Sequence, residues 1–155
     1  MKTKNNYCSV KELMKRIQNG KVAFDNPVQR PSGQWNYQKK SLLIDSLLTM
    51  FIPEIFAIES DGKLDIIDGK QRLTTIFEFI KNEFVLEDVE KIKLPAVSDE
   101  LYEINNKKFK DLHEDVQEAI YSHMLSIKIV ELEDGEDVEN IVDDIFYRLN
   151  NGEAV

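Results

Sequence analysis

Cysteine is almost absent from this sequence of 155 residues, and long apolar runs are missing. The single cysteine, Cys8, has no partner for an internal disulfide, which fits a reducing compartment such as the cytoplasm. No stretch approaches the roughly 20 apolar residues that a membrane-spanning helix needs, and the first residues lack the pattern of a secretory signal. We therefore expect a cytoplasmic protein without a membrane anchor.

Histidine is equally scarce. His113 and His123 are not spaced as metal ligands, and the sequence holds no cluster of cysteine and histidine. It also lacks a Walker phosphate-binding loop and a nucleophile elbow. Without a cluster of His, Asp and Asn to hold a catalytic metal, we expect no nuclease activity from this chain alone.

Positive charge is in deficit, because 20 basic residues face 29 acidic ones and the net charge is −9. An acidic surface argues against tight nonspecific binding to a nucleic-acid backbone. It leaves room for a local basic pocket, and the basic residues nearest the middle of the chain include Arg30, Lys39, Lys40, Lys70 and Arg72. The length and an apolar content of 42% suit one compact domain.

Apolar periodicity and turn residues predict alternating helices and strands. Ser9 with Glu12 forms a capping-box signature at the first helix, and Asp61-Gly62 is a hairpin turn signal. We predict helices over 9–19, 38–49, 70–81, 113–124 and 138–149, and strands over 22–24, 55–58, 64–67, 84–86 and 125–130. These elements indicate an α+β domain over residues 9–155, preceded by a flexible N-terminus over 1–8. The chain stops just after the last helix, so we expect it to be the N-terminal part of a longer protein.

Three of these helices carry clear apolar stripes that we expect to face the core. In the second and third helices the stripes are Leu42, Leu43, Leu47 and Leu48, and Leu73, Ile76, Phe77 and Ile80. In the last helix the stripe is Val138, Ile141, Val142, Ile145 and Leu149.

The segment Asp68-Gly69-Lys70-Gln71-Arg72 is the strongest candidate for a site, because a buried strand there runs directly into a helix. The first N–H groups of a helix lack partners and carry the positive end of the dipole. Gly69 would let an anion approach the backbone, while Arg72 offers a fork suited to phosphate oxygens and Lys70 a second cation. A carboxylate at Asp68 would repel phosphates unless Mg²⁺ bridged the two.

A purely structural interpretation of the same segment stays open. Asp68 is a good N-cap, and Gln71 three residues later completes a capping-box pattern. Arg72 would then be a surface ion-pair partner. On this interpretation the segment starts a helix and binds nothing.

Two further segments are site-like. Arg30 lies in a loop with prolines and glycine, and Trp35 follows it; the alternative is that Trp35 plugs the core and Arg30 stacks on it. Arg148 and Asn150 flank the end of the last helix, where a cation is favoured in any case. Neither Arg30 nor Arg72 has an obvious local carboxylate at helical spacing, so we predict that both face one cleft.

Four segments taken together resemble one family: Gln29-Arg30 with Trp35, residues 43–48 leading to Ile52-Pro53, residues 68–73, and Phe146 with Arg148-Leu149-Asn150. The family is the domain of unknown function at the N-terminus of GmrSD-type modification-dependent restriction enzymes and related phage-defence proteins. The resemblance runs from about residue 9 to the end. The usual motif reads Asp-Gly-Gln-Gln-Arg, and Lys70 here replaces its first glutamine.

The resemblance implies a ParB/sulfiredoxin-like fold, with a small mixed sheet flanked by helices. It also implies a Gly-x-x-Arg turn, here Gly69 to Arg72, against nucleotide phosphates. Sulfiredoxin chemistry needs a cysteine after that glycine, and Lys70 in its place excludes this activity. Members of the family are thought to bind and hydrolyse nucleoside triphosphates and to act with a C-terminal nuclease, often of the His-Asn-His type.

From the residues and the resemblance together we expect Mg²⁺-dependent binding and hydrolysis of a nucleoside triphosphate. Gly69, Lys70 and Gln71 would offer N–H groups, and Arg72 and Arg30 would clamp phosphates, with Arg148 and Asn150 as further nucleotide contacts. Asp68 would hold Mg²⁺ or orient water, and Gln71 is the other candidate for that second role.

Two alternatives remain beside hydrolysis. One is a non-catalytic nucleotide switch or DNA-sensing module. The other is a toxin–antitoxin-like or assembly partner that binds no nucleotide. DNA bound through a further domain and a homo-oligomer are compatible with each.

Overall fold

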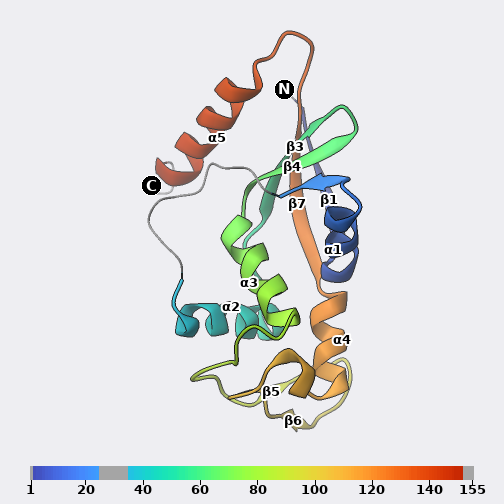
Figure 1. Cartoon of the computed structure of the whole chain (residues 1–155), viewed down its shortest axis with the longest axis vertical. Coiled ribbons are helices and arrows are strands. Elements are labelled where there is room, and N and C mark those ends of the chain that lie inside the picture. Colours follow the sequence, from blue (N-terminus) through green and yellow to red (C-terminus); the bar gives the residue numbers. More distant parts are fainter. Residues whose placement is uncertain (1, 25–34, 152–155) are drawn as a thin grey trace.

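A mixed sheet of five strands forms the centre of the molecule, in the order β1-β7-β3-β4-β2 (Figure 1). The computed structural model describes residues 2–24 and 35–151, except for the side chains of 149–151. Strand β1 pairs antiparallel with β7, β7 parallel with β3, β3 antiparallel with β4, and β2 parallel with β4. The strands are β1 Lys2–Ser9, β2 Val22–Ala23, β3 Ile55–Ser60, β4 Lys63–Asp68 and β7 Met124–Glu131.

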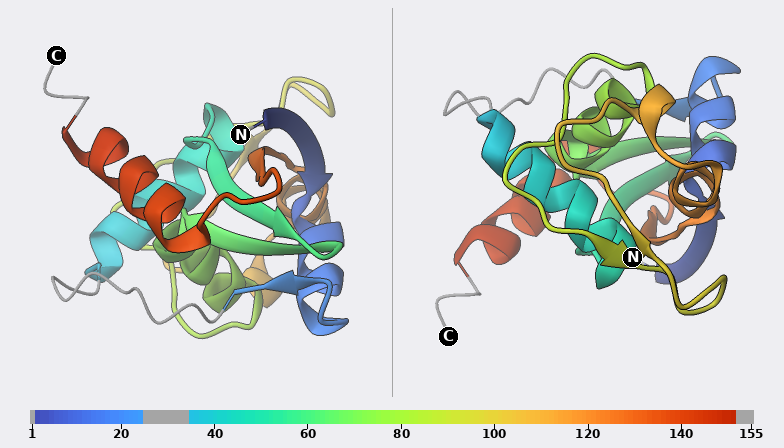
Figure 2. Two further views of the ribbon diagram at one scale, coloured as in Figure 1. Left: turned by 90° about the horizontal axis from the view of Figure 1, so that it is seen from above. Right: turned by 90° about the horizontal axis from the view of Figure 1, so that it is seen from below.

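Helices flank this sheet on both faces, which confirms the predicted α+β class with a small mixed sheet. They are α1 Val10–Gln18, α2 Tyr37–Thr49, α3 Lys70–Ile80, α4 Glu114–Ser122 and α5 Val138–Asn151, with a short 3₁₀ turn at Phe109–Asp111. The views along the long axis show α1 and α5 on opposite sides of the molecule (Figure 2). None of these helices combines the length and apolar character that a membrane crossing requires, within the residues described.

The local signals predicted several elements correctly. The backbone N–H of Glu12 donates to the Ser9 hydroxyl at 3.0 Å, so the first helix begins with the expected cap. Asp61 and Gly62 turn the hairpin between β3 and β4, both with positive φ. Both features depend on residues close in sequence, which is why the sequence indicates them.

The N-terminal segment differs from the prediction of a flexible tail over residues 1–8. Lys2–Ser9 form an edge strand that is in register with all of β7, from Lys2 opposite Glu131 to Ser9 opposite Met124. Lys4 lies 2.8 Å from Glu131 and 3.3 Å from Glu59, and Cys8 is buried in the main core. This edge strand is mostly polar, so its sequence shows no alternation of apolar residues. Its pairing with β7 and the ion pairs of Lys4 hold it in place, and neither is visible in the local sequence.

The main core lies on one face of the sheet, under α1 to α4, and extends into the irregular segment before α4. The opposite face carries a small cluster of Ile58, Ile67 and Val130, which α5 covers. No side chain of α5 described here is fully buried, and Val138 is 43% exposed. The predicted stripe of α5 is therefore wrong for Val138, and Leu149 lies outside the described side chains.

The inward faces of α2 and α3 also differ in part from their predicted stripes. Leu42 is 60% exposed, and Ile44 takes the buried position instead. In α3, Phe79 is buried, whereas Phe77 is half-buried against Phe24. When several apolar residues are adjacent in a helix, apolar spacing alone does not show which of them faces the core. The elements that pack against the helix determine this.

The predicted strand over 84–86 is wrong. Leu86 exchanges backbone hydrogen bonds with Asn106 and Lys107, and this contact does not continue because Asp88 has a φ of 53°. A separate two-stranded sheet forms farther on, between β5 Ile92–Lys93 and β6 Leu101–Tyr102. It lies below the main sheet, next to α2 and α4 (Figure 1).

Candidate functional site

A β-bulge just before α3 sets the direction of the Asp68 side chain. Phe56 of β3 lies opposite Asp68, but Ala57 lies opposite Ile66, so Ile67 is an extra residue in β4. Ile66 faces the main core, and simple alternation would turn Asp68 toward that core as well. The bulge instead brings Asp68 to the face occupied by Phe56, which packs with the cluster under α5.

Gly69 makes the turn from β4 into α3. Its φ of +101° is the left-handed conformation that side chains disfavour, and a Cβ atom there would overlap the Cδ1 atom of Ile55. The same Cβ would lie 3.3 Å from Nη2 of Arg72. The positive φ and the close contact with Ile55 therefore both favour glycine at this turn.

The start of α3 carries no side-chain cap, which contradicts the predicted capping box of Asp68 and Gln71. Gly69 is the N-cap residue, and it has no side chain that could accept a hydrogen bond from the first turn. Within the described residues, the Gln71 side chain makes no hydrogen bond, while its carbonyl accepts from Thr75. Neither Asp68 nor Gln71 therefore caps the positive end of the helix dipole.

Asp68 pairs with Arg72 instead of capping the helix. The distance from Nη2 of Arg72 to Oδ2 of Asp68 is 3.3 Å, and the two side chains are only 12% and 25% exposed. Asp68 is thus the carboxylate four residues before Arg72 that the sequence analysis failed to recognise as a local partner. The low exposure of the Arg72 side chain also shows that Arg72 is not a surface ion-pair partner.

The same arginine nitrogen ties the site to the start of β3. Nη2 of Arg72 donates to the carbonyl oxygen of Glu54 at 3.2 Å, and the Glu54 carboxylate accepts from the Ser126 hydroxyl at 2.8 Å. Burial lowers the pKa of Arg72, and the charge of Asp68 opposes this shift. Arginine stays protonated under all such shifts, so the site holds a permanent, largely desolvated cation.

Lys128 is a second cation near this site that the sequence did not single out. Phe56 lies in register with Lys128 of β7 on one side and with Asp68 of β4 on the other. Residues in register share a face, so Lys128 and Asp68 are on the order of 10 Å apart across Phe56. Lys128 is half-buried and forms no ion pair with residues of 2–24 or 35–151. Lys128 comes near Asp68 only because β3 pairs with β7, and this long-range pairing cannot be recognised from the sequence.

Comparison with known proteins assigns the chain to a family. The family model for the GmrSD restriction endonuclease N-terminal domain matches residues 10–154. The chain is a member of the GmrSD N-terminal domain family. The same comparisons found no match among curated proteins or solved structures.

The other residues that the GmrSD resemblance singles out are placed less completely. Arg30 lies outside the described residues, so its predicted meeting with Arg72 stays a prediction. Trp35 packs half-buried against the main core, and the ammonium group of Lys39 lies 4.6 Å from its ring centroid. The cation on this ring in the described structure is therefore a lysine from the first turn of α2.

At the end of α5, Arg148 is 75% exposed and donates from Nε to Asp144 at 3.1 Å. No described contact joins Arg148 to Asp68 or Arg72, and the Asn150 side chain lies outside the described part. The described residues also hold no group of three or more His, Cys, Asp or Glu side chains that could bind a metal ion. Among the predicted site residues that the structure describes, Asp68 is the carboxylate, and it lies at the start of α3.

Proposed function

We propose that this GmrSD-type domain binds a nucleoside triphosphate at the start of α3 and hydrolyses it with Mg²⁺. The largely buried Arg72 beside a glycine at the start of α3 carries the proposal, because Asp68 is turned aside to Arg72 instead of capping the helix, and a helix start next to an arginine suits an anion. Arg72 uses a single nitrogen for both of its contacts. Its Nε and Nη1 groups thus make no hydrogen bond with described residues and are suited to phosphate oxygens.

The roles of the other residues follow from their positions. Gly69, Lys70 and Gln71 offer backbone amides, Lys128 adds a positive charge across Phe56, and Arg30 is the proposed second clamp. Asp68 would hold Mg²⁺ or orient the attacking water, and Gln71 is the alternative for positioning water. The turn from Gly69 to Arg72 is also the feature on which the proposed ParB/sulfiredoxin relationship depends.

One observation favours a second candidate, a non-catalytic nucleotide switch. The Asp68 carboxylate is already paired with Arg72, so Mg²⁺ binding must weaken that ion pair. Because Arg72 also holds the Glu54 carbonyl, a phosphate that draws Arg72 away would alter the start of β3. In a restriction-type protein of the cytoplasm, such a change would be passed to a nuclease domain acting on DNA, and we expect no DNA cleavage by this chain itself.

A thermal-shift screen with the four common triphosphates and Mg²⁺, followed by measurement of released phosphate, separates these functions. Ligand at 100 times its dissociation constant adds about 2.7 kcal/mol of stability. Stabilisation with phosphate release supports hydrolysis, and stabilisation without release supports the switch. A protein that no triphosphate stabilises at millimolar concentration would contradict both and leave an assembly partner.

A further inference from the structure

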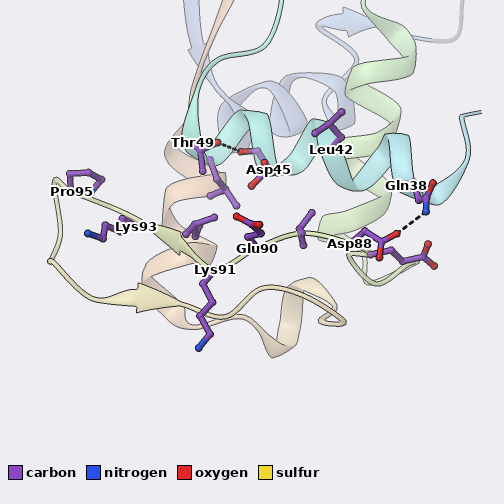
Figure 3. Close-up of a pocket in the computed structure, with 13 residues that line it drawn as sticks. Gln38, Leu42, Asp45, Thr49, Asp88, Glu90, Lys91, Lys93 and Pro95 are labelled. Atoms are coloured by element: carbon purple, nitrogen blue, oxygen red, sulfur yellow. Dashed lines mark hydrogen bonds between the residues drawn. The ribbon is translucent and has the colours of Figure 1, made fainter.

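A groove on the far side of α2 from the sheet is unconnected with the α3 site. It has a volume of about 830 Å³ and lies between one face of α2 and the extended segment 87–95 (Figure 3). From α2 it is lined by Leu42, Asp45 and Leu48, and from the segment by Val89 and Glu90. At one end, the Gln38 side chain donates to Asp88 at 2.7 Å and joins the two walls.

Two carboxylates face each other inside this groove. The Asp45 side chain points down from α2 and the Glu90 side chain points up toward it (Figure 3). Lys91 and Lys93 also line the groove, but their side chains point away from these two carboxylates. Neither Asp45 nor Glu90 forms an ion pair with residues of the described ranges. Burial raises the pKa of Asp45, and the charge of the nearby Glu90 carboxylate raises it further.

An exposed leucine lies about one helical turn before Asp45 on α2. Leu42 is 60% exposed although its neighbours Leu43 and Ile44 are buried. Leu48 and Val89, on the two walls, are half-buried and pack against the main core, so their outer surfaces line the groove. The groove thus combines an apolar position with a negative charge next to it.

We propose that the groove binds an amphipathic basic helix of a partner protein, with an apolar side chain on Leu42 and a Lys or Arg side chain between Asp45 and Glu90. The charge of the groove selects a basic partner and disfavours nucleic acid. It also disfavours a second copy of this chain, because two such grooves would repel each other. With 13 residues, α2 is about 20 Å long, which matches about four turns of a bound helix.

Binding of a synthetic peptide tests this proposal. The probe is a fluorescent 15-residue peptide of leucine and lysine with the leucines at helical spacing, and its control has the same composition in scrambled order. In anisotropy titrations at physiological salt, we expect the protein to bind the amphipathic peptide at least about 10-fold more tightly than the scrambled one. Asp45→Asn with Glu90→Gln should weaken that binding about 10-fold, as should Leu42→Ser.

The matched control pair is Glu118→Gln with Glu139→Gln, which removes the same two charges from exposed positions on α4 and α5. It should leave the binding of the amphipathic peptide unchanged. Equal binding of the two peptides, or equal weakening by the two pairs of substitutions, would overturn the proposal, because net charge alone would then explain the binding. Concentration-dependent dimerisation that Leu42→Glu abolishes would also overturn it, since a second copy would then cover the groove.

Discussion

Arg72 donates from one nitrogen to the Glu54 carbonyl and to the Asp68 carboxylate, and its side chain is 12% exposed. Arg72→Ala would leave a carbonyl and a carboxylate without this partner in a largely desolvated place. We predict a loss of about 2 kcal/mol in the free energy of unfolding, measured by urea denaturation.

The chain contains its own control for this prediction. Asp144 and Arg148 have the same spacing of four residues, but their side chains are 56% and 75% exposed. Arg148→Ala should change the stability by no more than about 0.5 kcal/mol. Equal effects at the two arginines would show that burial of the Asp68–Arg72 pair has no energetic consequence.

Gly69 is predicted to tolerate no side chain. Gly69→Ala combines a φ of +101° with overlap on Ile55, so we expect a loss of about 2 kcal/mol or more. Gly62→Ala has a φ of +76° but meets nothing within 4 Å, so strain alone should cost about 1 kcal/mol. Ile55→Val removes the overlapping Cδ1 atom and should recover part of the Gly69→Ala loss in a double-mutant cycle. Additive losses in that cycle would refute the proposed contact.

Asp45 is predicted to destabilise the fold at neutral pH. Its pKa is raised in the folded state, so the fold binds this proton more tightly and loses stability as the pH rises through the titration. Asp45→Asn should therefore be slightly more stable than the wild type at pH 7, by no more than about 0.5 kcal/mol because solvent screens the charge, with the difference shrinking as the pH falls through the titration of Asp45. Thermal melts across this pH range measure it, with Asp99→Asn as an exposed control. A wild type more stable than Asp45→Asn at pH 7 would contradict the assignment.

At the scale of elements, local patterns predicted the helices and the β3–β4 hairpin because caps, turns and apolar spacing lie within a few residues. Strand β1 escaped prediction because its partners on β7 are more than 100 positions away. The strand predicted over 84–86 is wrong for a related reason. Its apolar residues, such as Phe84 and Leu86, fill the main core without forming a ladder of strands.

Strand β1 provides a prediction at this scale. Eight of its residues pair with β7, so their amides should exchange slowly wherever they donate to that strand. Hydrogen exchange followed by mass spectrometry should show protection in a peptide covering 2–9, close to that of a peptide from β7. Exchange of that peptide at the rate of an unfolded chain would contradict the pairing of β1 with β7 and support a flexible N-terminus.

At the scale of the whole molecule, the sequence singles out the candidate residues 68–72 but not the residues that the fold places around them. Residues 68–72 are contiguous, so their combined chemistry can be recognised from the sequence alone. Glu54, Ser126 and Lys128 join the site only through strand pairing and the bulge at Ile67, neither of which has a local signal. The expected capping box failed for the same reason, because the bulge turned Asp68 toward Arg72.

The central claim is that the start of α3 binds the phosphates of a nucleoside triphosphate through Arg72. Isothermal titration of the best-binding triphosphate with Mg²⁺ tests it most directly, on the wild type, on Arg72→Lys and on the control Arg16→Lys, a half-buried arginine of α1 that pairs with Glu12. Lysine keeps the charge but loses the fork, so Arg72→Lys should bind about 10-fold more weakly while Arg16→Lys matches the wild type. Folded Arg72→Lys protein that binds the triphosphate as tightly as the wild type would contradict the account.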